Sequence, residues 1–150
     1  MTAIYNSEQI NELAAFFLTR DSFQSWTPTV TQLGSVTVTV NYARYLVLGP
    51  LAFTIGRLTV TGSGTAGNAI EIGGQPTALQ TAHSGGSRDV IGTAVVLDSG
   101  TTRYEGALTA TSPTVWRIQL DSQTSVLGST PSFALAAGDE IGFLAAFERT

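Results

Sequence analysis

The chain has 150 residues, of which 12% are charged, and its net charge is −4. The length suits one domain with a buried core, while the acidic balance argues against nucleic acid as a partner, because a grip on phosphates needs clustered basic side chains. Every one of the seven basic residues is arginine, and the lack of cysteine excludes disulfides and thiolate metal sites.

Residues 7–20 carry the only pattern typical of a helix. Ser7 suits the N-cap, and Ala14 belongs to an apolar stripe at helical spacing. Phe16 widens the stripe, so the proposed docking face consists of Ile10, Leu13, Phe16, Phe17 and Leu18. A wide apolar arc on a short helix needs a packing partner. Three partners stay open: another protein, two further copies of the helix in a trimer, or the chain's own sheet.

From Trp26 onward the pattern changes to the period of two that is typical of strands. The clearest stretch is residues 35–48, which we expect to form a half-exposed antiparallel strand. One face is predicted to carry Val36, Val38, Val40 and Tyr42, and the other Thr37, Thr39 and Asn41.

Gly49-Pro50 interrupts this pattern, and residues 51–61 resume it, so a hairpin is predicted. Here Leu51, Phe53 and Ile55 share one face, whereas strict alternation would put Leu58 and Val60 on the other face of the strand. A β-bulge at Gly56 would bring all five to the same side.

Further strands are predicted at residues 27–31, 68–72, 89–97, 102–109, 114–121 and 141–148. Turn residues separate them, including Asp98-Ser-Gly100 and Gly138-Asp139. Together these make about eight short strands, which favours an antiparallel β-sandwich or barrel. No apolar run reaches the roughly 18 residues of a transmembrane helix, and no signal-peptide pattern begins the chain, so membrane insertion is not expected.

Residues that could carry chemistry are sparse. Gly62–Gly67 matches G-x-G-x-x-G, but a strand follows where a dinucleotide-binding fingerprint needs a helix, so the segment is interpreted as a loop. His83 is the single histidine, in a loop without a nucleophile-elbow sequence. The carboxylates are scattered, and the neighbours Asp139 and Glu140 point to opposite faces of a strand. We therefore expect no enzyme activity and no cofactor, and leave only an oxygen-ligated Ca²⁺ site open.

The aromatic residues offer a second kind of site, a surface on which a sugar could stack. Trp116 alternates with Ile118 and Leu120, which places it in the core or a subunit interface. Tyr45 and Tyr104 are the freer candidates to face a receptor.

Several of these segments resemble the jelly-roll heads of tailed-bacteriophage structural proteins, and the resemblance covers residues 26–150. It is carried by Trp26–Val30, Tyr42–Tyr45, Gly49–Phe53, Leu58–Val60, Gly92–Ala94, Asp98–Gly100, Tyr104–Gly106, Ala137–Ile141 and Phe147-Glu148. Such heads have a TNF-like topology and assemble as homotrimers. The resemblance implies an all-β fold, an antiparallel jelly-roll sandwich with a short N-terminal α-helix, in a protein of the virion surface.

That family performs two tasks. Capsid decoration proteins clamp the shell through a short N-terminal arm, and tail-fibre or baseplate heads bind the host receptor. A chain that begins at Met1 without a fibre shaft favours decoration. The expectation is thus a docking segment at residues 1–25 that binds the major capsid protein or a tail protein, and a head at residues 26–150. A receptor-binding head for a host surface glycan is the alternative.

Overall fold

The computed structural model describes Glu8 and residues 23–85, 89–100, 102–120 and 126–150. The described segments contain ten strands and one 3-10 turn, η2 (Thr77–Leu79). The strands are β1 (Gln24–Ser25), β2 (Thr29–Gln32), β3 (Gly34–Val36), β4 (Val38–Leu48), β5 (Leu51–Val60), β6 (Glu71–Gly73), β7 (Val90–Asp98), β8 (Thr102–Ser112), β9 (Val115–Gln119) and β10 (Glu140–Glu148).

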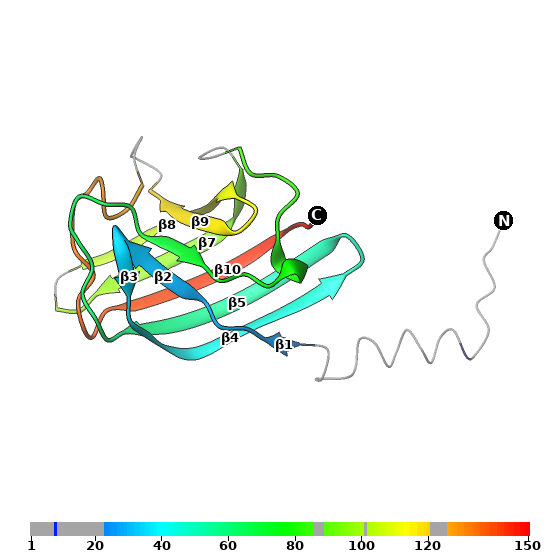
Figure 1. The fold of residues 1–150 in the computed structure, drawn as a ribbon, viewed down its shortest axis with the longest axis horizontal. Coiled ribbons are helices and arrows are strands. Elements are labelled where there is room, and N and C mark those ends of the chain that lie inside the picture. The colour runs from blue at the N-terminus through cyan, green and yellow to red at the C-terminus, as the bar shows by residue number, and fades with distance from the viewer. Residues whose placement is uncertain (1–7, 9–22, 86–88, 101, 121–125) are drawn as a thin grey trace.

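Hydrogen bonds join these ten strands into one antiparallel sheet in the order β1-β4-β5-β10-β7-β8-β9-β6-β2-β3. The sheet curls, so that β2 and β3 lie in front of β5 and β10 (Figure 1). The expected all-β, antiparallel class is confirmed, as is the hairpin of β4 and β5. The pairing forms a single curled sheet, and the jelly-roll connection stays a prediction. The predicted helix and its docking residues, Ile10, Leu13, Phe16, Phe17 and Leu18, lie outside the described residues.

The concave side of the curled sheet encloses an aromatic core. Trp116 of β9 packs edge-on against Phe143 and Phe147 of β10, with ring centroids 6.2 and 5.6 Å apart. Trp26 completes the cluster at 5.9 Å from Trp116. Each large ring removes 150–250 Å² of surface from water. These contacts hold the two layers of the curl together, and they place Trp116 in the core.

Gly56 makes room for this cluster rather than forming a bulge. A Cβ at Gly56 would lie 2.2 Å from the ring of Phe143, whereas β5 pairs with β10 in unbroken register through this position. The predicted bulge at Gly56 is therefore wrong. The register shift lies in β4 instead, between Val40 and Tyr42, and it moves Tyr42 from the predicted valine face to the opposite one.

Two buried polar side chains fix the loops at the rim of the core. Gln32, 1% exposed, donates from Nε2 to the carbonyls of Asn68 and Phe133 and accepts from the Leu135 N–H. Asp139 accepts from the N–H groups of Ser99 and Ala136, both at 2.8 Å. The turn predicted at Gly138-Asp139 is confirmed, and Gly138 supplies its positive φ of 100°.

Candidate interaction surface

The convex face of β4, β5, β10, β7 and β8 is called the outer face here. Its side chains stand in rows that cross the strands. One row consists of Tyr42, Arg57, Gly142, Val95 and Glu105. Each of these residues pairs with the next one, which lies on the adjacent strand. The next row along the strands runs Arg44, Ile55, Leu144, Thr93 and Ala107. This regular register brings residues of the β4–β5 hairpin, the β7–β8 hairpin and β10 onto one continuous surface.

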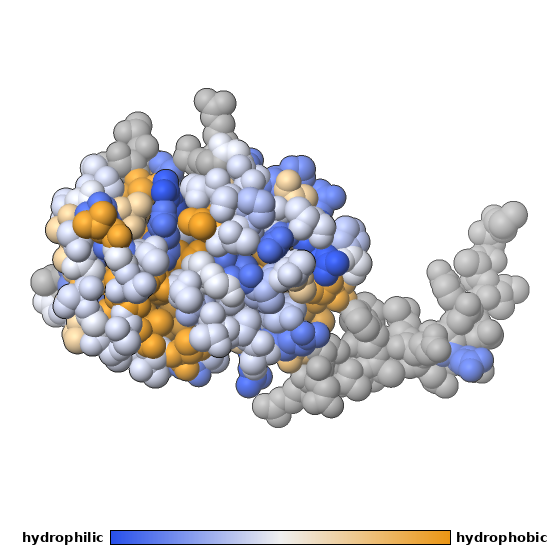
Figure 2. Space-filling view, in the orientation of Figure 1, coloured by the Kyte–Doolittle hydropathy of each residue, from blue (hydrophilic) through white to orange (hydrophobic). Residues whose placement is uncertain are grey.

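Large apolar side chains are exposed on this outer face. Leu144 is 57% exposed, Leu51 45%, Leu97 43%, Tyr42 42% and Ile55 40%. Single exposed apolar residues are ordinary on a protein surface, but a contiguous group indicates an interaction site. The opposite side of the molecule, seen in Figure 2, mixes pale and blue residues with orange, hydrophobic ones that gather mainly toward the left.

Strand β5 shows how unusual this arrangement is. It turns Ala52, Thr54 and Gly56 inward and Leu51, Phe53 and Ile55 outward, so the last three share one face as predicted, while Leu58 and Val60 lie on the opposite, buried face. Thr54 and Gly56 must be small because Trp26 contacts Thr54 and the ring of Phe143 leaves no room for a Cβ at Gly56. Thr54 satisfies its hydroxyl there by accepting from the Trp26 indole N–H at 3.2 Å and donating to the Arg44 carbonyl.

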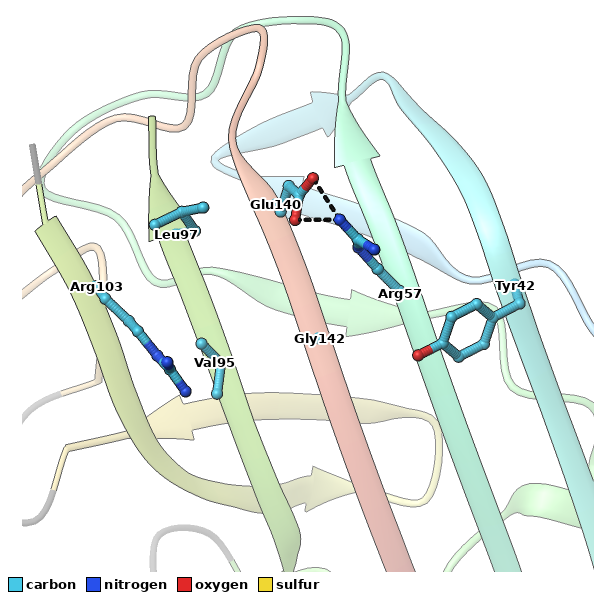
Figure 3. Close-up of a pocket in the computed structure, with 7 residues that line it drawn as sticks. All are labelled: Tyr42, Arg57, Val95, Leu97, Arg103, Glu140 and Gly142. Carbon is cyan, nitrogen blue, oxygen red and sulfur yellow. Dashed lines mark hydrogen bonds and ion pairs between the residues drawn. The ribbon is translucent and has the colours of Figure 1, made fainter. Parts of the chain in front are cut away.

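A hollow lies in the middle of the outer face, above Gly142 of β10. Figure 3 shows the bare strand at Gly142, with Val95 and Leu97 on one side and Arg57 on the other. Tyr42, Arg103 and Glu140 complete the lining of this hollow, which is called the slot from here on and has a volume of about 290 Å³. A Cβ on Gly142 would meet no atom within 4 Å, so the fold itself does not require glycine here.

The charged groups around the slot are paired. A single Arg57 guanidinium nitrogen donates to both Glu140 carboxylate oxygens at 2.7 Å, and Arg103 contacts Glu105 at 2.6 Å. The hydrogen bond to Glu140, followed by its negative charge, raises the pKa of Arg57. Both pairs are exposed, so solvent screens them and each adds little to stability. The slot thus combines apolar walls with a locally balanced charge.

Each remaining residue that the sequence singled out has a definite place. Tyr45 is 8% exposed on the concave side, where its hydroxyl donates to Gln24. Tyr104 is half-buried and stacks on Phe133 with centroids 5.0 Å apart. Neither ring face lies on the outer face. His83 Nε2 lies 3.0 Å from a Glu148 oxygen, in an exposed contact.

Sequence reasoning placed Leu51, Phe53 and Ile55 on one face but did not decide whether that face is buried or exposed. The sequence of the last strand, Glu140–Glu148, hints at an apolar outer face. Its odd-numbered residues Ile141, Phe143 and Phe147 are apolar, and so are the even-numbered Leu144 and Ala146 on the other face. Apolar residues of both parities are typical of a strand that is covered on both faces. Here nothing among the described residues covers the second face, on which Leu144 is 57% exposed and Glu140 and Glu148 also lie.

Comparisons with protein-family models, curated proteins and solved structures find no match for this chain. Within the described part, no helix is long and apolar enough to cross a membrane. Among the same residues, no group of three His, Cys, Asp or Glu side chains could hold a metal ion. The outer face, with its apolar walls and paired charges, is chemically suited to contact with another surface.

Proposed function

We propose that this chain is a non-enzymatic structural protein of a bacteriophage virion, a homotrimer on the outer surface that acts as a capsid decoration protein. Its head would be a TNF-like jelly roll, and residues 1–25 would dock it on the particle. The observation that carries the proposal is the exposed apolar outer face, because a head of this kind needs a surface on which copies of itself can assemble. The sequence resemblance supplies the virion context.

The face suits assembly better than it suits binding of a sugar. A sugar-binding surface presents an open aromatic ring, and of the two predicted tyrosines one is buried and the other is stacked within the chain. The outer face instead offers aliphatic side chains such as Ile55 and Leu144. A receptor-binding head for a host glycan is therefore the second candidate, supported by the resemblance and by exposed Tyr42.

Two measurements on the intact chain test the proposal. Sedimentation velocity at micromolar concentration should give a trimer; a stable monomer would overturn the homotrimer. Counting copies per particle then separates the two tasks, because decoration requires hundreds of copies and a tail organelle holds at most a few dozen. A low copy number would replace decoration with the receptor-binding alternative.

The docking segment has its own test. Phe17→Asp should abolish attachment to the particle while circular dichroism of the head stays unchanged, because it places a charge in the proposed apolar stripe. Thr19→Asp is the matched control, with the same added charge off the stripe, and should attach normally. Unchanged occupancy of Phe17→Asp particles would refute docking through this stripe.

A further inference from the structure

The slot above Gly142 raises the question of what fills it. A glycine inside a strand weakens the strand and commonly marks a place where another group approaches the backbone closely. Gly56 of β5, which pairs with Phe143 of β10, is explained by the ring of Phe143. Gly142 has no such explanation within the described residues, since a Cβ there would touch nothing. A group that approaches the backbone here would have to come from outside this surface.

Leu144 provides the matching protrusion. It lies two residues from Gly142 on the same strand and the same outer face, and at 57% exposure it is the most exposed leucine of that face. The outer face therefore carries a leucine-sized protrusion next to an apolar-walled hollow of about 290 Å³. In a ring of three copies, the protrusion of one copy can enter the hollow of the next.

The charges of the outer face point to the same partner. The face carries three arginines (Arg44, Arg57 and Arg103) and three glutamates (Glu105, Glu140 and Glu148), so its net charge is zero. The whole chain has a net charge of −4, which would make two copies repel each other on average. On a neutral face with both signs interspersed, identical copies can meet without that repulsion.

We propose that copies of this chain meet through the outer face around a threefold axis that passes beside Gly142 and Leu144, so that Leu144 of each copy enters the slot above Gly142 of the next, head to tail. The inference rests on the proposed homotrimer and identifies its interface. Walls formed by Val95 and Leu97 would cover the leucine, while the Arg57–Glu140 pair lies at the rim. Buried apolar anchors in a pocket commonly dominate the affinity of an interface.

Filling the slot gives the first test. Gly142→Val should fold at least as well as the parent, because valine favours strands and has room, yet it should weaken self-association about tenfold or more by blocking the slot. Gly34→Val is the matched control: it also adds a side chain in open space, but on β3, away from the outer face. Association is measured by sedimentation velocity over a dilution series.

Removing the protrusion gives the second test. Leu144→Ser should weaken association by a similar factor, whereas Leu33→Ser, at a 76% exposed leucine off the outer face, should leave it unchanged. The chain lacks cysteine, so a mixture of the Gly142→Cys and Leu144→Cys variants, refolded together and oxidised, can report the contact directly. A disulfide-linked pair containing one of each variant is the expected product.

The outcomes separate this inference from the proposed function. A parent chain that stays monomeric overturns both. A parent trimer that survives Gly142→Val and Leu144→Ser overturns the interface and leaves the trimer standing. If these variants keep the trimer but lose occupancy on the particle, the outer face contacts another virion protein, and the inference is wrong.

Discussion

The two faces of β5 and β10 differ in what their side chains must fit. On the concave side, Phe143 and Phe147 fill the space between two layers of one sheet, and the facing residues of β5 are correspondingly small. On the convex side, Ile55 and Leu144 are large, apolar and exposed. Hydrophobicity alone therefore does not distinguish core positions from surface positions in these strands. The space that neighbouring aromatic rings leave free decides which face of a strand is buried.

The largest expected effect is on the concave side. Trp116→Ala should lower the free energy of unfolding by about 3–5 kcal/mol, because it empties a fully buried ring site shared by Trp26, Phe143 and Phe147. Urea denaturation followed by circular dichroism measures it. A loss below about 1 kcal/mol would mean that the curl is not held by this cluster.

Two adjacent glycines give the sharpest contrast between the faces. Gly56→Ala should destabilise by about 1–3 kcal/mol, since its Cβ would overlap the Phe143 ring. Gly142→Ala should be neutral or stabilise by about 0.5–1 kcal/mol, because the methyl group meets only open space and alanine restricts the unfolded chain. Both are measured by urea denaturation at one low protein concentration. Equal effects of the two substitutions would contradict the assignment of the faces.

The smallest expected effect is on the convex side. Ile55→Thr keeps a β-branched residue at a 40% exposed position, so the unfolding free energy of the isolated chain should change by no more than about 0.5 kcal/mol. The matched change at the core, Ile72→Thr, buries an unpaired hydroxyl at a fully buried site and should cost several times more. A large loss from Ile55→Thr alone would place Ile55 in the core after all.

Particular elements show where local sequence sufficed. Gly49-Pro50, Asp98–Gly100 and Gly138-Asp139 were predicted as turns and are turns, because their residues tolerate or impose the required backbone angles. The strand at Glu71–Gly73 begins three residues later than predicted. Gln32 could not be found in advance, because its partners lie 36 to 103 residues away along the chain.

The sequence by itself determined an all-β chain of short antiparallel strands, since alternation and turn chemistry act over a few residues. Only the tertiary structure decided which face of β5 points inward, because that choice depends on Trp26 and Phe143, which come from distant segments. The shift between Val40 and Tyr42 depended on pairing with β5 in the same way. The outer face is therefore a product of long-range packing, although every residue in it is visible in the sequence.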